Sequence, residues 1–488
     1  MFIVMVTPEC APAAKVGGLG DVIQGLSKEL AIRGHAVEVI LPKYNCMRYD
    51  RIWGLTKSYS DLWVPYHNQW VHCDVYFGFV DGLKCFFIDA HSPHNFFNRG
   101  VYYGQVDDAD RFAFFCRAAL EFLLKSNKHP DIIHCHDWQT ALVPVLLYEL
   151  YQPLGLRHPR VCYTLHNLGH QGIHGEHILR QVGLNPAYLM SPDRLRDDHH
   201  PAINLMKGGI VYSNFVTTVS PRYAHEIRHT PLGMGLQRIL GAHSQKFGGV
   251  LNGLDYNAWN PEVDPHIARR YSTASLQDKY ANKDALRHRL WLRDGFSPII
   301  SFVGRLDYQK GVDLIFHAVP YCLSRGCQFV LLGSSPHGHI NHAFWNLKRR
   351  FNDHPDCHLE IGYDEELAHL IYAGSDIILV PSEYEPCGLT QIIGLKYGTV
   401  PVVRNTGGLA DTVFDADYAH RPFHERDGYL FNDYNWQGLE SALRRAIGLW
   451  QHYPQHFREL MANGMRYDYS WNYPGQHYLN IYNYIREP

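Results

Sequence analysis

The sequence predicts an α/β protein whose doubly wound parallel sheets lie in two tandem domains. Short apolar segments rich in β-branched residues alternate with amphipathic helical segments along most of the chain. Strands that alternate with helices form parallel sheets with helices on both faces. The alternation begins again near residue 298, and 488 residues are enough for two or three domains.

The first half opens with a strand–helix–strand unit. Residues 2–9 are apolar and β-prone, residues 20–34 have helical spacing and end on glycine, and residues 35–42 form a second apolar run. The remaining elements expected in this half are strands at 74–80, 83–90, 131–137, 160–167 and 215–220, and helices at 111–126 and 140–151.

The second half repeats this order. Residues 298–305 and 328–333 are expected strands, separated by a helix at 311–326. Further strands are expected at 357–363, 376–382 and 399–405, and further helices at 365–374, 389–398 and 470–485. We therefore predict domains at 1–246 and 247–469, with a terminal helix at 470–488 that crosses back to the first domain.

Composition narrows the classes of function. The net charge of −3 gives no reason to expect nucleic acid or an acidic membrane as a partner. The 11 cysteines contain no C-x-x-C pair, which favours reduced thiols over disulfides or a zinc ribbon. No signal peptide and no 18-residue apolar run is recognisable. We expect a cytoplasmic protein, or one of the plastid stroma if this is a mature plant or algal form.

A glycine-rich loop joins the first strand to the first helix, and it reads KVGGLGDV. Gly17 and Gly18 lack side chains, so backbone N–H groups could approach a ligand closely. Lys15 and the helix N-terminus would add positive charge, and together they suit a phosphate. The plainer alternative is a tight turn beside a solvated lysine. The loop matches neither common phosphate-binding fingerprint.

The corresponding loop of the second domain reads GRLDYQKG. Arg305 and Lys310 follow a buried strand, five residues apart, and could bind a diphosphate. Taken alone, they could equally be two surface cations. Their equivalence with the first loop favours the binding hypothesis.

Two strands of the first half end in polar residues, in DIIHCHDW and YTLHNLGHQG. Ligands of such sheets bind beyond the carboxyl ends of the strands, where Asp137 and His166 would lie. A metal site built from His134, Cys135 and His136 is disfavoured, because alternate side chains of a strand point to opposite faces. The alternative for His166 is a core histidine with satisfied hydrogen bonds.

The segment SEYEPCGLTQ (382–391) places polar residues between a buried strand and a helix. A helix beginning near Gly388 offers free N–H groups of Gly388, Leu389 and Thr390 to an anion. Glu385 would then meet a neutral, hydroxyl-rich group beside that anion, since a carboxylate accepts hydroxyls and repels phosphate. The alternative is an exposed carboxylate in a turn.

Several long motifs resemble those of bacterial glycogen synthases and plant starch synthases, and they run in the same order over residues 1 to about 485. They include KVGGLGDV, HDWQTALVP, TLHNLGHQG, VLNGLDYNAWNP, GRLDYQKGVDL and PSEYEPCGLTQIIGLKYGTVPVVRNTGGLADTV. The resemblance implies a retaining glycosyltransferase of family 5 with the GT-B fold, in which two Rossmann-like domains face a central cleft. The valine at Val16 resembles the residue of the starch synthase III/IV branch and related cyanobacterial enzymes. Many other members of the family have threonine at this position.

The resemblance also implies roles for individual residues. The catalytic set comprises Glu385, His166, Arg305, Lys310 and Asp137. The residues implied for nucleotide-sugar binding are Lys15, Gly17, Gly18, Asp21, Asn252, Tyr363, Cys387, Gly388, Leu389 and Thr390. Within that set, Asp21 lies at the sugar end of its loop, Asn252 lies near the hinge, and Tyr363 stacks on the adenine.

The implied reaction is transfer of glucose from ADP-glucose to the non-reducing 4-hydroxyl of an α-1,4-glucan such as glycogen, starch or a maltooligosaccharide. No metal ion and no pyridoxal phosphate is expected, and the oligomeric state stays open. Alternatives are a transferase that uses UDP-glucose and a non-catalytic scaffold that binds or initiates glucan. A hydrolase would need two carboxylates across one bond, and a phosphorylase would need a cofactor lysine in a longer chain.

Overall fold

The computed structural model describes residues 1–487 and divides the chain into two compact units. Unit 1 contains Met1–Gly253 together with the chain from Trp471 onward, and unit 2 contains Leu254–Ser470. Each unit has an α/β architecture built on a largely parallel sheet.

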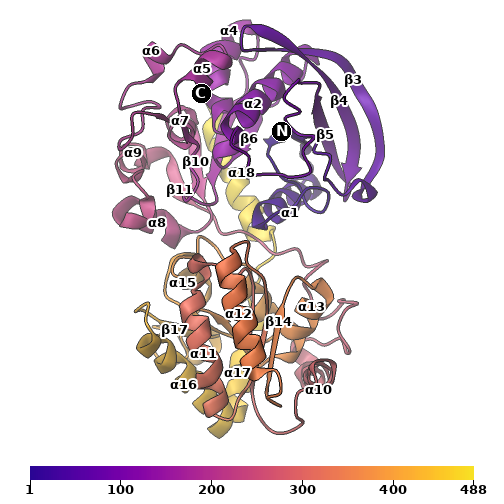
Figure 1. Cartoon of the computed structure of the whole chain (residues 1–488), viewed down its shortest axis with the longest axis vertical. Helices are drawn as coiled ribbons and strands as arrows, with labels where there is room; N and C mark the ends of the chain where they lie inside the picture. The colour runs from indigo at the N-terminus through magenta and orange to yellow at the C-terminus, as the bar shows by residue number, and fades with distance from the viewer. Residues whose placement is uncertain (488) are drawn as a thin grey trace. The chain divides into compact units, whose positions relative to one another are not determined.

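Unit 1 is built on a nine-stranded sheet with the order β11-β10-β7-β6-β1-β2-β5-β4-β3 (Figure 1). Its strands are β1 (Phe2–Val6), β2 (Ala36–Pro42), β3 (Ile52–Tyr66), β4 (Gln69–Val80), β5 (Leu83–Ala90), β6 (Ile132–His136), β7 (Arg160–Leu165), β10 (Phe215–Thr218) and β11 (Phe247–Gly249). A separate two-stranded sheet pairs β8 (Ile173–His174) with β9 (Ile203–Asn204). The central strand β1 is continuously apolar because helices cover both faces of the sheet.

The helices of unit 1 include three of 15 or more residues and several short ones between later strands. They are α1 (Gly18–Ile32), α2 (Asp108–Lys125), α3 (Leu142–Leu146), α4 (Gln152–Leu154), α5 (His177–Gln181), α6 (Pro186–Leu189), α7 (Leu205–Tyr212), α8 (Pro221–His229), α9 (Gln237–Ala242) and α18 (Asn472–Arg486).

An antiparallel hairpin of β3 and β4 extends the sheet at one edge (Figure 1). The sequence pattern predicted part of β4 but not the 15-residue β3. As an edge strand, β3 exposes most of its first ten residues, so it lacks the continuous apolar run of the inner strands.

The terminal helix α18 packs within unit 1, against α1 and β7 (Figure 1). Trp471 lies directly on α1, where a Cβ atom at Gly25 would come within 1.9 Å of its indole Nε1. At the other end of the helix, the Tyr482 hydroxyl lies 2.8 Å from Nδ1 of His134 in β6. The C-terminal helix therefore packs into the same core of unit 1 as the N-terminal segments of the chain.

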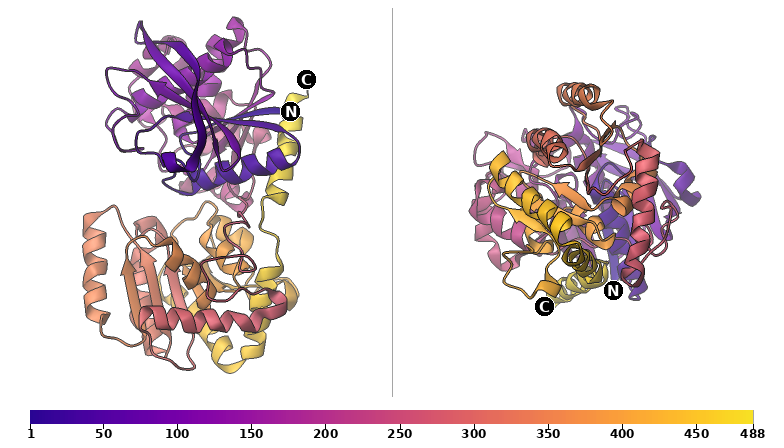
Figure 2. Two further views of the ribbon diagram at one scale, coloured as in Figure 1. Left: turned by 90° about the vertical axis from the view of Figure 1, so that its right-hand side faces the viewer. Right: turned by 90° about the horizontal axis from the view of Figure 1, so that it is seen from below.

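Unit 2 contains a six-stranded parallel sheet with the order β14-β13-β12-β15-β16-β17 and helices on both faces (Figure 2). Its strands are β12 (Ile299–Val303), β13 (Gln328–Gly333), β14 (Cys357–Ile361), β15 (Ile377–Val380), β16 (Val400–Arg404) and β17 (Tyr429–Phe431). Its helices are α10 (Lys279–Leu290), α11 (Val312–Ser324), α12 (Gly338–Phe351), α13 (Glu365–Gly374), α14 (Thr390–Lys396), α15 (Gly407–Thr412), α16 (Trp436–His452) and α17 (Pro454–Arg466).

The predicted boundary after residue 246 lies seven residues too early. Residues Phe247–Gly249 form β11, which pairs with β10 at the edge of the unit 1 sheet. Backbone pairing with β10 therefore keeps this segment in unit 1, which continues to Gly253. The second boundary falls after Ser470, one residue beyond the predicted position.

The sequence led us to expect neither a membrane-spanning helix nor disulfide bonds. Within residues 1–487, no helix is both long and apolar enough to cross a lipid bilayer. No disulfide bond joins any of the 11 cysteines, all of which lie in the described residues.

Candidate functional site

Three polar segments of unit 1 lie at the same edge of its sheet. The loop at residues 15–18 follows β1, Asp137 directly follows β6, and His166 directly follows β7. These three strands are parallel neighbours, with β6 between β1 and β7. The carboxyl ends of parallel strands meet at one edge, which is where ligands of such sheets bind.

The lysine of the glycine-rich loop forms an ion pair with the first turn of α1. Lys15 Nζ lies 2.8 Å from Oδ1 of Asp21, and the two side chains are 44% and 35% exposed. Both residues therefore lie at the protein surface, as the binding hypothesis requires. A phosphate that binds Lys15 would compete with the Asp21 carboxylate for its charge.

A buried carboxylate that the sequence analysis missed holds this loop. Glu9 is 4% exposed, and its Oε2 accepts hydrogen bonds from the backbone N–H groups of Val16 (2.8 Å) and Gly17 (3.2 Å). The hydroxyl of Tyr103 donates to Oε1 at 2.7 Å. Burial raises the pKa of this carboxyl, against the opposing effect of these hydrogen bonds.

The contact with Glu9 changes which backbone N–H groups of the glycine-rich loop can bind a ligand. The N–H of Gly17 is occupied within the protein, because a buried carboxylate needs donors. Of the two glycines, this leaves the N–H of Gly18, which begins α1, for an incoming anion. The signal in the sequence was a carboxylate three residues after the end of a buried strand, in T-P-E.

We expect Glu9→Ala to lower the free energy of unfolding by about 1–3 kcal/mol, because two loop N–H groups and a tyrosine hydroxyl lose their partner. Glu9→Gln keeps a carbonyl acceptor and should lose less than half of this. Chemical denaturation followed by circular dichroism measures both values. Glu176→Ala, which removes a 42% exposed partner of Arg180, is the control and should change stability by at most about 0.5 kcal/mol. Equal stability of Glu9→Ala and the unmodified protein would contradict this role.

Asp137 has an unusual backbone and holds the residue that follows β7. Its φ of 56° and ψ of −177° lie in a region that L-residues rarely adopt. Its Oδ1 accepts hydrogen bonds from the N–H groups of His166 (2.7 Å) and Asn167 (3.4 Å). Burial raises the pKa of Asp137 to about 7, although these two bonds act in the opposite direction. Asp137 thus positions the main chain of His166 directly.

His166 is half-buried and neutral at physiological pH. Burial lowers the pKa of its imidazole to about 3. A neutral imidazole donates one hydrogen bond and accepts one. One ring nitrogen, Nε2, lies 3.2 Å from Nδ1 of His136. His166 therefore suits the binding of hydroxyl groups rather than the supply of positive charge.

The histidines of β6 make contacts within the protein. His134 and His136 lie on the same face of the strand, with ring centroids 4.1 Å apart. His134 is engaged by Tyr482 and Thr164. Among residues 1–487, no group of three or more histidine, cysteine, aspartate or glutamate residues is arranged to hold a metal ion.

Asn252 lies three residues beyond β11, near the end of the first segment of unit 1. It is 8% exposed, and its side-chain oxygen is buried without a hydrogen-bond partner. A buried amide oxygen without a donor is a place for a ligand group or a water molecule. Its predicted role in nucleotide-sugar binding stays a prediction.

In unit 2, the structure brings Lys310 to Glu385, which lies 75 residues further along the chain. Lys310 Nζ is 2.5 Å from Oε2 of Glu385, which also accepts a hydrogen bond from Ser382 Oγ at 2.9 Å. Glu385 is 5% exposed, so the alternative of an exposed turn carboxylate is excluded. Arg305 is 61% exposed and lies 3.4 Å from Asp307. The two predicted phosphate-binding cations are therefore in one loop but in different electrostatic surroundings.

The segment around Cys387 and Gly388 is shaped by close backbone packing. Gly388 has a φ of +78°, which favours glycine. The backbone N–H of Gly408 donates to the Glu385 carbonyl at 3.0 Å, and a Cβ atom at Gly408 would meet the Cys387 carbonyl oxygen at 2.1 Å. The helix α14 begins at Thr390, and its N-cap residue, Leu389, makes no side-chain capping bond to the first turn.

Tyr363 lies two residues beyond β14 and is 82% exposed. Its hydroxyl donates to Glu365 at 3.3 Å. An exposed ring in this position can stack on a planar ligand. Stacking on adenine stays a prediction.

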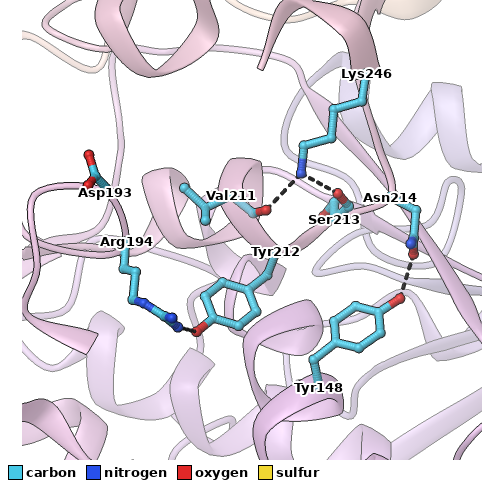
Figure 3. A pocket seen from close by; sticks show the side chains of 8 residues that line it. All are labelled: Tyr148, Asp193, Arg194, Val211, Tyr212, Ser213, Asn214 and Lys246. Atoms are coloured by element: carbon cyan, nitrogen blue, oxygen red, sulfur yellow. Dashed lines mark hydrogen bonds between the residues drawn. The ribbon is translucent and has the colours of Figure 1, made fainter. Parts of the chain in front are cut away.

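A separate hollow of about 640 Å³ lies in unit 1, near the start of β10 (Figure 3). Lys246 donates there to the carbonyls of Val211 and Ser213, and the Tyr148 hydroxyl donates to Asn214. The amino ends of β7 and β10 lie at the edge of the sheet opposite to Asp137 and His166. Most polar groups of this hollow are paired with one another, and the bonds from Lys246 hold the chain where α7 ends, whereas the Ser213 hydroxyl is buried without a hydrogen-bond partner among residues 1–487.

Two family models match the chain. The model described as the starch synthase catalytic domain matches residues 2–242, and the model described as glycosyl transferases group 1 matches residues 288–459. The first match falls within unit 1 and the second within unit 2.

Curated relatives match over the whole length. Glycogen synthase 1 of Nitrosococcus oceani is 69% identical, with 100% of both chains covered. Glycogen synthase 2 of Methylococcus capsulatus is 66% identical, with 99% of both chains covered.

Solved structures match the fold. The catalytic domain of starch synthase IV from Arabidopsis thaliana, solved with ADP and acarbose, superposes with a TM-score of 0.97 at 44% identity, covering 100% of this chain and 99% of that one. A sucrose-phosphate synthase from Thermosynechococcus elongatus has a TM-score of 0.61 at 18% identity, with 99% and 98% of the two chains covered, and shares the fold. The expected GT-B architecture and the expected family are both confirmed, and the chain belongs to the glycogen synthase and starch synthase family of glycosyltransferases.

Proposed function

We propose that this glycosyltransferase moves glucose from ADP-glucose to the non-reducing 4-hydroxyl of an α-1,4-glucan, with retention at the anomeric carbon. The observation that carries the proposal is the pair formed by the partly buried Lys310 and the buried Glu385 at the carboxyl edge of the unit 2 sheet. It places a cation for phosphate beside a carboxylate for sugar hydroxyls. The choice of ADP-glucose is supported by the related starch synthase IV structure, which was solved with ADP.

In this mechanism, the donor breaks between the anomeric carbon and the diphosphate oxygen. Negative charge grows on the leaving phosphate, and Lys310 and Arg305 are the cations proposed to stabilise it. Stabilisation of developing charge is usually the largest contribution to catalysis, and loss of one such group lowers the rate by roughly 10²- to 10³-fold. These side chains would supply the positive charge, so we propose no metal ion and no pyridoxal phosphate.

The glucosyl group needs partners for its hydroxyls. Oε2 of Glu385 is occupied by Lys310 and Ser382, which leaves Oε1 to accept sugar hydroxyls. The neutral imidazole of His166 is the group of unit 1 proposed to bind the transferred sugar. The leaving phosphate is the proposed base for the acceptor hydroxyl, so that attack and departure occur on the same face of the ring.

The first experiment measures nucleotide release from ADP-glucose and from UDP-glucose, each with and without glycogen. We expect rapid ADP release that requires glycogen and is lost in Glu385→Ala and Lys310→Ala. Release from UDP-glucose alone would retain the reaction and overturn the proposed donor. If neither donor is consumed, the chain is better explained as a non-catalytic glucan-binding scaffold.

We also propose a cytoplasmic location. None of the 11 cysteines is in a disulfide bond in the described structure, and this supports a reducing compartment, since disulfides accumulate in oxidising ones.

A further inference from the structure

The ring of His166 has a neighbour that no part of the mechanism uses. Nδ1 of His136, the last residue of β6, lies 3.2 Å from Nε2 of His166. The ring centroids are 5.4 Å apart with an interplanar angle of 40°, so the rings meet edge to edge through these nitrogens rather than by stacking. His136 is fully buried.

The surroundings of His136 limit what else it can do. Its backbone N–H donates to Thr140 Oγ1 at 2.7 Å, which fixes the main chain. Its other ring nitrogen, Nε2, is buried and has no hydrogen-bond partner among residues 1–487. The neighbouring His134 differs, because both of its ring nitrogens have partners, the Tyr482 hydroxyl at 2.8 Å and Thr164 Oγ1 at 2.7 Å. The contact with His166 is therefore the one hydrogen bond of the His136 ring.

The hydrogen-bond partners of the His136 ring indicate which of its two nitrogens carries the hydrogen. Burial lowers the pKa of both His136 and His166, so both imidazoles are neutral and each carries one hydrogen. If His136 carried its hydrogen on Nε2, a buried N–H would have no acceptor. If it carries the hydrogen on Nδ1, only a lone pair at Nε2 is left without a partner. Orphaned buried N–H groups are the rarer of the two cases in proteins. His136 is therefore the donor, and Nε2 of His166 is the acceptor.

We propose that His136 is a positioning residue, whose Nδ1–H holds the His166 ring in the tautomer that carries its hydrogen on Nδ1. This tautomer leaves an N–H donor on the ring nitrogen that His136 does not contact. His136 thus holds the ring of His166, and Asp137 holds its main chain. That the donated hydrogen serves a sugar hydroxyl rests on the proposed function, whereas the hydrogen bond and the tautomer do not.

The kinetic experiment compares two replacements of His136, of which one keeps an N–H donor and the other does not. Asparagine places an amide N–H near the position of Nδ1, whereas leucine fills similar space without a donor. With glycogen in excess, we expect His136→Leu to lower kcat about 10- to 100-fold, since misplacement of a catalytic group by about 1 Å has effects of this size. His136→Asn should recover most of the activity. In a His166→Ala background, His136→Leu should have little further effect.

His134→Leu is the comparison variant, because it removes a buried histidine of the same strand whose hydrogen bonds go to Tyr482 and Thr164 and not to His166. The His134 ring packs on the His136 ring, with centroids 4.1 Å apart, so some loss of kcat is expected, but a smaller one than in His136→Leu because the hydrogen bond to His166 is kept. Equal losses of kcat in His134→Leu and His136→Leu, or additive losses of His136→Leu and His166→Ala, would mean that His136 acts only through folding.

A chemical measurement tests the tautomer without enzymatic turnover. Diethyl pyrocarbonate reacts with an imidazole nitrogen that has a free lone pair. In the proposed arrangement, Nδ1 of His166 carries hydrogen and the lone pair of Nε2 is engaged, so His166 should react slowly. Peptide mapping by mass spectrometry should show several-fold faster modification of His166 in His136→Leu but not in His136→Asn.

The outcomes of the two experiments are separable. If the unmodified protein transfers no glucose but His166 shows the expected protection, the proposed function is wrong and the positioning inference holds. If His166 reacts equally fast in all three proteins, His136 does not hold its ring, whatever the activity.

Discussion

Replacement of Lys310 by methionine is expected to lower glucosyl transfer by roughly 10²- to 10³-fold and to destabilise unit 2 by about 3 kcal/mol. The first effect follows from the loss of a cation beside the leaving phosphate. The second follows because Glu385 is 5% exposed and would remain charged with only Ser382 as a partner. Breaking a buried ion pair costs about 3–5 kcal/mol, and the 22% exposure of the Lys310 side chain favours the lower end.

A double variant separates the two effects. Lys310→Met combined with Glu385→Gln removes both charges and leaves a neutral amide of similar size. Most of the lost stability should return, whereas activity should stay at the level of the single variant or below. Urea denaturation and ADP release measure the two quantities on the same preparations. Recovery of activity in the double variant would show that Lys310 serves only to neutralise Glu385.

A pair in the same unit with a more exposed carboxylate is the control. Lys348 and Glu360 lie 3.4 Å apart, with 22% and 38% of their side chains exposed. Partly exposed pairs contribute about 0–1 kcal/mol, so Lys348→Met should change stability by no more than this. Its activity should match that of the unmodified protein.

Gly408→Ala is expected to reduce activity about 100-fold and to lower the free energy of unfolding by about 1–3 kcal/mol. The added Cβ would lie 2.1 Å from the Cys387 carbonyl oxygen and 2.4 Å from its Cα, so the backbone near Glu385 must shift. A displacement of about 1 Å at a catalytic group lowers the rate about 10²-fold. Overpacking by one methyl group costs about 1–3 kcal/mol. Steady-state kinetics and denaturant unfolding measure these effects.

Gly448 offers a matched substitution without the clash. It lies inside α16, and nothing lies within 4 Å of a Cβ atom built there. Gly448→Ala should preserve activity and raise stability by about 0.5–1 kcal/mol, because alanine favours the helix. Full activity of Gly408→Ala would show that the position of the Glu385 segment is not critical for transfer.

Much of the architecture could be predicted from the sequence, because inner parallel strands have a strong local signal. The strands at 83–90 and 328–333 and the helix at 365–374 coincide with β5, β13 and α13. The sequence pattern did not predict strands whose side chains are only partly buried or that are very short. The edge strand β3 (Ile52–Tyr66) exposes most of its residues, and β11 (Phe247–Gly249) is too short to recognise without its partner β10.

The sequence order of the motifs was enough to predict that the candidate site consists of residues at the ends of strands. The side chains and backbone groups that these residues contact could not be predicted. Glu9 was missed because its contact with the loop at Val16 and Gly17 depends on how that loop folds back. His136 was considered only as part of a metal site, because its distance to His166 depends on the pairing of β6 with β7.

The sequence by itself determined the alternation of strands and helices, the family, and the residue types at the strand ends, since each depends on residues close together in the chain. Only the tertiary structure decided which of these residues meet. Lys310 and Glu385 are 75 positions apart, and His136 and His166 are 30 apart. Whether a lysine is a free phosphate ligand or half of an ion pair depends on distances of a few ångströms. Those distances arise from the packing of whole elements, which no local pattern specifies.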